Sequence, residues 1–364
     1  MYIHEHANWP NMAWDQNKLC QLNAEVRFLQ GRLHGRMDTL GHQLREEATL
    51  ATLTQDVLQT SAIEGVKLDI AEVHPAIAQH LGININPPKT ISLNAKGIIE
   101  IAMDVTRNYT YPLTQERLFG WHATLFPEHG ITIGAWRNET IGPMQVISGG
   151  IGREVIHYEA PSAERLHAEM ARFLKWLNAP SKTDLIIKSA LAHFWFVTIH
   201  PFEDGNGRIA RAIGDMVLAR SEKSKQRFYS MSAQIQRERN VYYDMLESCQ
   251  KGSLDITAWI EWYFNCLKRA IAASEEILQA VLAKARFWEA NRDVEFNKRQ
   301  RKVINRLLDG VEGKLTTSKW AKLAKCSQDT ALRDIDNLLA RKILTKNEAG
   351  GRSTSYQLQA HDFD

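Results

Sequence analysis

The chain has 364 residues, of which 44% are hydrophobic and 24% are charged. This length favours two or three compact units, and the balanced composition excludes a disordered, collagenous or coiled-coil protein. No run reaches the ~20 consecutive apolar residues that span a bilayer, so no membrane partner is expected. The four cysteines form no CxxC pair, which argues against a disulfide framework and a zinc site. With no secretory signal evident at the N-terminus, a cytoplasmic protein is expected.

Charge is distributed unevenly along the chain. The net charge is +3, but residues 298–352 alone carry +8 and the remainder carries −5. A basic cluster of this kind is typical of a nucleic-acid-binding module, and a solvated helical face rich in lysine is about as common. Both interpretations stay open from charge alone.

Hydrophobic spacing predicts mostly helices. Residues 15–64 have helical spacing and no proline, which indicates a helical N-terminal region. Pro87 and Pro88 predict a loop and a boundary near residue 85, because proline removes a donor and restricts φ. Between 130 and 161, glycines and short β-branched runs predict a hairpin. Helical spacing then resumes over 162–177, 185–199 and 208–220.

The last 70 residues have a pattern of their own. Helical segments at 300–308, 317–324 and 328–339 precede short strand-like runs at 343–345 and 355–358, with Gly350 and Gly351 as the turn. Three helices and a hairpin resemble a winged helix. In such a module the third helix would present Gln328, Thr330, Arg333 and Asp334 to a DNA groove. Winged helices also dock proteins, so the partner stays open.

The run from His200 to Arg211 carries the strongest chemical signal. Pro201 disfavours helical geometry at His200, so one helix should end there with the imidazole at its C-terminal end. Gly205 and Gly207 permit a turn that aims successive N–H groups to one side, and the next helix begins with free donors. Such a junction is an anion cradle.

Charged side chains around this cradle suit a polyphosphate. Arg208 and Arg211 lie three residues apart on one helix face, so both guanidinium groups can reach phosphate oxygens. Asp204 is placed to hold a divalent cation that bridges phosphates. The His200 imidazole can accept a proton from an incoming hydroxyl.

Residues 200–211 resemble the Fic-domain signature HPFx[D/E]GNGRxxR at every specified position. The resemblance implies a helical nucleotidyltransferase that moves AMP from ATP to a protein hydroxyl. It also implies a base histidine, a Mg²⁺-binding acidic residue, a loop around the α- and β-phosphates and two arginines on the β- and γ-phosphates. The relatives that transfer phosphate instead have a lysine-bearing loop, unlike Gly207-Arg208. The corresponding residues here are His200, Asp204, Gly205, Asn206, Gly207, Arg208 and Arg211.

A second signature lies far upstream. The run from Thr60 to Gly65 resembles the inhibitory helix motif [S/T]xxxE[G/N] of the same family. The resemblance implies that Glu64 pairs with Arg211 and occupies the guanidinium that the γ-phosphate needs. Alternatively, the run is an ordinary helix end in which Gly65 is the C-terminal cap.

Two further groups resemble family features. Gly134–Arg137, together with Ser148, Gly149 and Gly150, resembles the flap that aligns a target segment by strand-like pairing; a plain hairpin is the alternative. Tyr242 and Tyr243 resemble the tyrosine pair that lines the adenine pocket in some relatives. Gln250 stands where those relatives have asparagine, so an adenine contact and simple core packing both stay open.

We therefore expect a mainly α protein with an N-terminal helical region and inhibitory helix over 1–85, a Fic domain over 86–290 and a winged helix over 291–364. The expected activity is Mg²⁺-dependent transfer of AMP from ATP to a Ser, Thr or Tyr hydroxyl of a protein, itself included, restrained by Glu64 against Arg211. The alternatives are removal of AMP from a protein, and a transcriptional regulator that senses nucleotide and binds DNA. A homodimer stays open.

Overall fold

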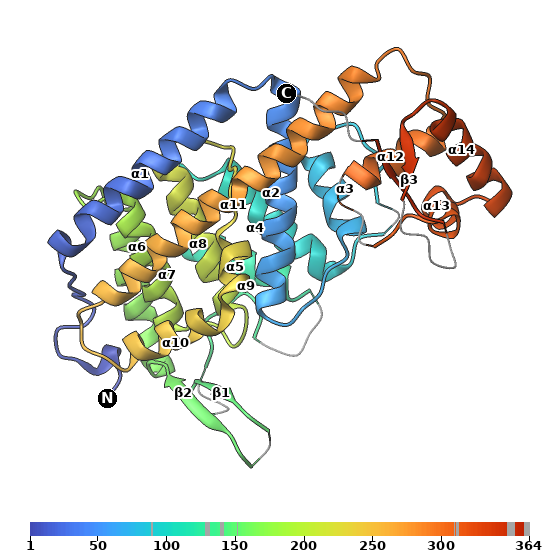
Figure 1. Cartoon of the computed structure of the whole chain (residues 1–364). Coiled ribbons are helices and arrows are strands. Elements are labelled where there is room, and N and C mark those ends of the chain that lie inside the picture. Colours follow the sequence, from blue (N-terminus) through green and yellow to red (C-terminus); the bar gives the residue numbers. More distant parts are fainter. Residues whose placement is uncertain are drawn as a thin grey trace. The chain divides into compact units, whose positions relative to one another are not determined.

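The computed structural model divides the chain into two compact units, Met1–Glu275 and Glu276–Asp364 (Figure 1). This division lies inside helix α11 (Thr257–Ala290), so the domain boundaries expected after residues 85 and 290 stay predictions. The structure describes residues 1–88, 90–127, 132–138, 142–150, 152–308, 310, 313–347 and 354–359.

Unit 1 is mainly helical, as the hydrophobic spacing predicted. Several helices begin at a side chain that accepts a main-chain N–H bond, including Asp15, Ser92 and Asp184. Before α11, its elements are η1 (Ile3–Glu5), α1 (Gln16–Asp38), α2 (His42–Ile63), α3 (Ile70–Leu81), α4 (Leu93–Arg107), α5 (Gln115–Leu125), β1 (Gln145–Ser148), β2 (Val155–Glu159), η2 (Ala163–Arg165), α6 (Leu166–Asn178), α7 (Leu185–Ile199), α8 (Asn206–Glu222), α9 (Met231–Arg237) and α10 (Arg239–Gln250).

Helix α7 forms the centre of unit 1. Every side chain from Ile186 to Ile199 is buried, as expected for a helix that is apolar on all sides. Helix α8 follows after a short turn and packs along α7 (Figure 1). Helix α2, from the N-terminal region, packs mainly on α9 and α3 and also contacts α8. This packing brings the C-terminal end of α2 to the junction between α7 and α8.

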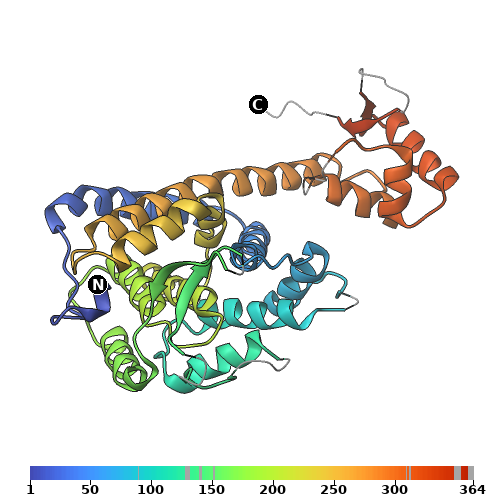
Figure 2. The same cartoon turned by 90° about the horizontal axis from the view of Figure 1, so that it is seen from below.

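The predicted hairpin is present but shorter than the glycine-rich segment suggested. Strands β1 and β2 pair antiparallel, with a register shift between Val146 and Ile147. Thr132 and Ile133 are irregular, and Ile131 lies outside the described residues. The hairpin lies beside α10, and Figure 2 shows it in front of the helices of unit 1.

Unit 2 has its own hydrophobic core, around the fully buried Trp320. Besides pairing with β3 (Leu344–Lys346), strand β4 (Tyr356–Leu358) forms an antiparallel bridge from Tyr356 to Leu315. The turn expected at Gly350-Gly351 lies outside the described residues. The elements after α11 are α12 (Lys298–Leu308), α13 (Thr317–Ala324), α14 (Gln328–Ala340), β3 (Leu344–Lys346) and β4 (Tyr356–Leu358).

The expected exposure of Asp334 on the third helix of unit 2 is wrong. Its side chain is buried and accepts bonds from Arg299 Nε at 2.9 Å and Asn297 Nδ2 at 2.8 Å. The arginine neutralises the carboxylate, which makes its burial tolerable. Gln328 and Arg333, by contrast, are exposed.

The mainly α fold with a small β-hairpin is confirmed. Among the helices that the structure describes, none has the length and apolarity to cross a membrane.

Candidate active site

His200 ends α7 in a left-handed conformation, with φ 51° and ψ 58°. Its ring Nδ1 lies 3.1 Å from the Val197 carbonyl oxygen. Because a carbonyl oxygen can only accept a hydrogen bond, Nδ1 carries the proton of the neutral ring, and Nε2 is the nitrogen that can accept one. Burial lowers the pKa of His200 to about 4, although the Val197 bond opposes that shift. The imidazole is therefore neutral near pH 7 and ready to act as a base.

The turn after His200 is held by two side chains. Asn206 Oδ1 accepts the Phe202 N–H at 3.0 Å, and Asn206 Nδ2 donates to the Phe202 carbonyl at 2.8 Å. Arg137 Nε donates to the His200 carbonyl at 2.8 Å, and its N–H donates to the Pro201 carbonyl at 2.9 Å. The side chain of Asn206 thus fixes the loop, and its main-chain N–H is what remains for an anion. This role of Arg137 was not predicted from the sequence, because the His200 carbonyl lies 63 positions away.

The start of α8 has the backbone geometry expected of an anion cradle. Gly205 has φ 82°, and a Cβ there would lie 2.9 Å from the Phe126 ring, so the turn requires glycine. The Ile209 N–H donates to the Gly205 carbonyl at 3.0 Å. Within the described part of the chain, the N–H groups of Asn206, Gly207 and Arg208 have no hydrogen-bond acceptor. With the positive end of the helix dipole, these donors suit a phosphate.

Arg208 lies beside this cradle, between an aromatic ring and a carboxylate. Its guanidinium lies 5.0 Å from the centre of the Phe126 ring and its Nη2 lies 3.7 Å from Asp204 Oδ2. Burial lowers the pKa of Arg208, and its Nε has no partner among the described atoms. Phe126 was not predicted from the sequence; it follows α5, far from the signature.

The end of α2 reaches the second arginine. Arg211 is almost fully buried and donates from Nη2 to Glu64 Oε1 at 2.7 Å and from Nε to Thr60 Oγ1 at 2.8 Å. Burial acts to lower the pKa of Arg211, but Glu64 outweighs it and the pKa is raised. A Cβ on Gly207 would collide with Glu64 Oε1. The Glu64 carboxylate therefore lies directly against the anion cradle.

Gly65 ends α2 immediately after Glu64. It has φ 80°, its N–H donates to the Ala62 carbonyl, and the Val66 N–H donates to the Ser61 carbonyl, each at 3.0 Å. This is a Schellman motif, which needs a left-handed residue at the position of Gly65. The run is therefore an ordinary helix end and also brings Glu64 to Arg211. The two interpretations are compatible, because the cap at Gly65 ends α2 directly after Glu64.

The candidate adenine residues differ in exposure. Tyr242 is 1% exposed, its hydroxyl lies 3.0 Å from His193 Nε2, and burial raises its pKa. Gln250 is 5% exposed and donates to Thr198 Oγ1 at 3.3 Å. Tyr243 is half-buried, with the Arg239 guanidinium 5.1 Å from its ring centre. Of the three, Tyr243 keeps the surface that a ligand could touch.

The flap candidates Ser148, Gly149 and Gly150 are exposed at the end of β1. Gly149 has φ 103°, and a Cβ there would collide with the Arg153 carbonyl, so the turn requires glycine. The Tyr158 hydroxyl donates to the Thr198 carbonyl at 2.8 Å. The hairpin is therefore attached to the last turn of α7, two residues before His200.

Asp204 fits one mode of Mg²⁺ binding. Its side chain is 64% exposed, and the described residues contain no cluster of three or more metal-ligating side chains. Mg²⁺ is commonly held by one or two carboxylates together with substrate phosphates and water, and a single accessible carboxylate beside a phosphate cradle fits that mode.

Two protein families match the chain. Residues 2–83 match a domain of unknown function, DUF4172, and residues 112–218 match the Fic/DOC family. Curated relatives include "Protein adenylyltransferase Fic" of Drosophila yakuba, 31% identical over 137 residues, and that of Nematostella vectensis, 35% identical over 115 residues. The matches cover 36% and 31% of this chain, and 26% and 25% of those proteins. The chain thus matches about a quarter of the length of these relatives.

Solved structures share the fold. A Fic family protein from Desulfovibrio desulfuricans G20 has a TM-score of 0.52 at 18% identity, over 94% of this chain and 97% of that one. Fic-1 (residues 134–508) from C. elegans has a TM-score of 0.50 at 19% identity, over 74% and 76%. Residues 112–218 therefore match the Fic/DOC family, and the fold is one that solved Fic proteins share.

Proposed function

We propose that the protein transfers AMP from ATP to a Ser, Thr or Tyr hydroxyl of a protein. The observation that carries this proposal is the α7–α8 junction, where a neutral imidazole lies close in the chain to three N–H groups that have no acceptor among the described residues. Arg208 and Arg211 add two cations on the same helix. The names of the curated relatives support the same reaction.

In this reaction the N–H groups of Asn206, Gly207 and Arg208 hold the phosphate oxygens, and Arg211 holds the terminal phosphate. His200 Nε2 takes the proton of the target hydroxyl, the hydroxyl oxygen attacks the α-phosphorus, and pyrophosphate leaves. Mg²⁺ held by Asp204 and the phosphates would neutralise negative charge when bound. Catalysis is then mainly positioning and charge stabilisation.

We further propose that Glu64 restrains the enzyme. Its carboxylate occupies Arg211 Nη2 and lies against Gly207, the two places that the polyphosphate needs. A triphosphate that enters with Glu64 in place loses one arginine contact and meets a like charge. It therefore binds without its α-phosphorus aligned for attack.

The test uses wild type, Glu64→Gly and the double variant with His200→Ala, each with Mg²⁺, cell lysate and ATP labelled at either the α- or the γ-phosphate. We expect α-label on protein, more with Glu64→Gly and none with the double variant. Incorporation of the γ-label would show phosphate transfer instead. Absence of both labels in all three proteins, with their folds intact, would overturn the proposed function.

Glu64 also supports a second candidate reaction at the same site, the hydrolysis of AMP from a modified protein. The Glu64 side chain is 29% exposed beside the cradle, so its carboxylate can meet water there. Wild type would then release AMP from a pre-adenylylated protein and Glu64→Gly would not. Equal release by both proteins would remove this candidate.

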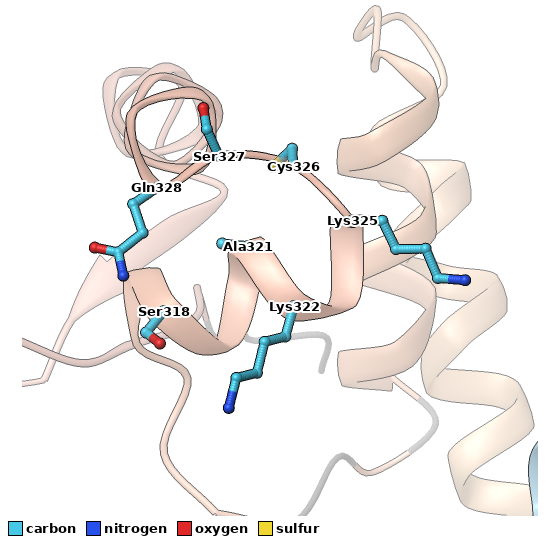
Figure 3. A pocket seen from close by; sticks show the side chains of 7 residues that line it. All are labelled: Ser318, Ala321, Lys322, Lys325, Cys326, Ser327 and Gln328. Atoms are coloured by element: carbon cyan, nitrogen blue, oxygen red, sulfur yellow. The ribbon is translucent and has the colours of Figure 1, made fainter.

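For unit 2 we propose a winged helix that binds DNA. Helices α12 to α14 precede the β3–β4 hairpin, and Leu315 pairs with Tyr356 of β4 as a short third strand. This order of helices and strands supports a winged helix. A surface depression of about 520 Å³ lies at the turn between α13 and α14, where Lys322, Lys325 and Gln328 are exposed (Figure 3). The test is a mobility shift of duplex DNA that weakens with salt and with Lys322→Gln plus Lys325→Gln; no shift at low salt would refute it.

A cytoplasmic location is proposed from cysteine chemistry. All four cysteines are free thiols in the structure, as suits a reducing compartment. Fractionation of cells that produce the full chain would test this location.

A further inference from the structure

The left-handed backbone of His200 must be held by its surroundings, because a residue other than glycine adopts φ 51° only at a cost. The last carbonyls of a helix also have no partner within the helix. At the end of α7 the Val197 carbonyl oxygen lies against the His200 ring, and Arg137 donates to the His200 carbonyl. The Thr198 carbonyl accepts the Tyr158 hydroxyl at 2.8 Å. The position of His200 therefore depends on a tyrosine of β2 as well as on its own turn.

The Tyr158 hydroxyl takes the place of a missing helical donor. In a continued helix the Thr198 carbonyl would accept the N–H of Phe202, but that N–H donates to Asn206 Oδ1 instead. Tyr158 is 1% exposed, and burial raises the pKa of Tyr158 well above its usual value. The hydroxyl thus keeps its proton and remains a donor to the end of α7.

The ring of Tyr158 packs against the N-terminal segment. The rings of Tyr2 and His4 meet it edge to face, with centroids 5.2 Å and 5.9 Å away. His4 Nε2 lies 2.9 Å from the carbonyl oxygen of Glu159, so Nε2 carries the proton of the ring, and burial lowers the pKa of His4, which keeps the ring neutral. Arg165 Nη2 donates to the His4 carbonyl at 3.1 Å. These contacts restrict Tyr158 to one orientation.

The N-terminal segment is itself anchored to the helical part of unit 1. Trp9 is buried, and its Nε1 donates to Glu169 Oε2 on α6 at 3.0 Å. The Ala13 N–H donates to the Leu254 carbonyl between α10 and α11 at 2.8 Å. The segment is therefore a fixed support for the Tyr158 ring.

We propose that Tyr158 is a positioning residue for the transfer of AMP. Its hydroxyl holds the end of α7, and with it His200, in the geometry that the reaction needs, while Tyr2 and His4 hold Tyr158. Tyr158 acts through His200 and touches no substrate in this role. This inference rests on the proposed adenylyltransferase function, and it gives a role to the beginning of the segment that matches DUF4172.

The matched control for Tyr158→Phe is Tyr263→Phe. Tyr263 is also 1% exposed, and its hydroxyl lies 2.7 Å from Ser189 Oγ, in the first half of α7. Each substitution removes one buried hydroxyl contact with the same helix and leaves the ring in place. Only Tyr158→Phe removes a contact at the end of the helix that carries His200.

The test places each substitution in the full chain with Glu64→Gly and measures kcat and the KM for ATP from α-label on lysate proteins. We expect Tyr158→Phe to lower kcat about tenfold, the upper end of what one hydrogen bond contributes. The KM for ATP should stay within about twofold, because the phosphates are held by α8, and Tyr263→Phe should change neither by more than about twofold. His4→Ala should lower kcat, and His4→Gln, whose amide can still donate to the Glu159 carbonyl, should restore most of it.

Hydrogen exchange of the His200 N–H, which donates to the Phe196 carbonyl at 3.0 Å, gives a readout that needs no ATP. We expect faster exchange with Tyr158→Phe and not with Tyr263→Phe, since only the former loosens the last turn of α7.

If kcat is unchanged with Tyr158→Phe, or falls equally with Tyr263→Phe, the inference is overturned and the proposed function stands. If Glu64→Gly labels no protein, the proposed function fails, and exchange alone decides on Tyr158. Faster exchange with Tyr158→Phe only would then support its hold on His200, and unchanged exchange would overturn it.

Discussion

The contact between Glu64 and Arg211 makes the strongest prediction about activity. Replacing Glu64 with glycine removes a charge-assisted bond of 2.7 Å to a guanidinium whose side chain is 2% exposed. Bonds to charged groups contribute about 1.5–3 kcal/mol. Because the Glu64 side chain is itself 29% exposed, solvent screening favours the lower part of that range.

A restraint of about 1.5–2 kcal/mol corresponds to a rate increase of about 10- to 30-fold when it is removed, since each 1.4 kcal/mol is a factor of ten. Glu64→Gln should give a smaller increase, because its amide oxygen can still accept from Arg211. Thr60→Val is the matched control. It removes the 2.8 Å bond to Arg211 Nε and keeps the carboxylate, so we expect an increase of only about threefold from one neutral acceptor.

The assay measures initial incorporation of α-labelled AMP at saturating ATP, with thermal unfolding of each variant as the control for folding. If Glu64→Gly is folded and its rate stays within twofold of wild type, the carboxylate does not restrain the reaction. An increase with Thr60→Val as large as that with Glu64→Gly would assign the restraint to the position of Arg211 and not to the Glu64 charge.

Three further outcomes are expected. Arg239→Met removes the 2.8 Å bond from its Nε to the Ile63 carbonyl at the end of α2, so it should raise the labelling rate less than Glu64→Gly does; an unchanged rate would contradict that. Because burial lowers the pKa of His200 to about 4, the neutral base persists down to that pH, and kcat/KM should decline only as pH falls through about 4; a decline near 6.5 would refute the burial argument. Asn206→Ala leaves the buried N–H and carbonyl of Phe202 without partners, at about 1–3 kcal/mol each, so Tm should fall by several degrees; an unchanged Tm would contradict the loop-fixing role.

The sequence alone was sufficient to predict those features that depend on residues close together in the chain. The mainly helical fold follows from hydrophobic spacing, and most predicted helices lie within a few residues of their observed bounds. The turn at Gly205 and the start of α8 could be predicted because a left-handed turn and a helix start are properties of consecutive residues. Gly65 as a helix cap is local for the same reason.

Only the tertiary structure decided which distant side chains meet. Glu64 and Arg211 are 147 positions apart, and packing of α2 on α8 is what joins them. Arg137 reaches the His200 carbonyl across 63 positions. No local pattern encodes such contacts, because they depend on how helices pack.

Burial was likewise decided by packing. The sequence identified Tyr242 and Gln250 as candidate ligand contacts, but both lie buried and bonded to side chains of α7. Asp334 was expected at a DNA groove and is instead buried against Arg299. A polar residue type shows that a partner is needed, and only the packed fold shows whether that partner is solvent, a ligand or a neighbouring side chain.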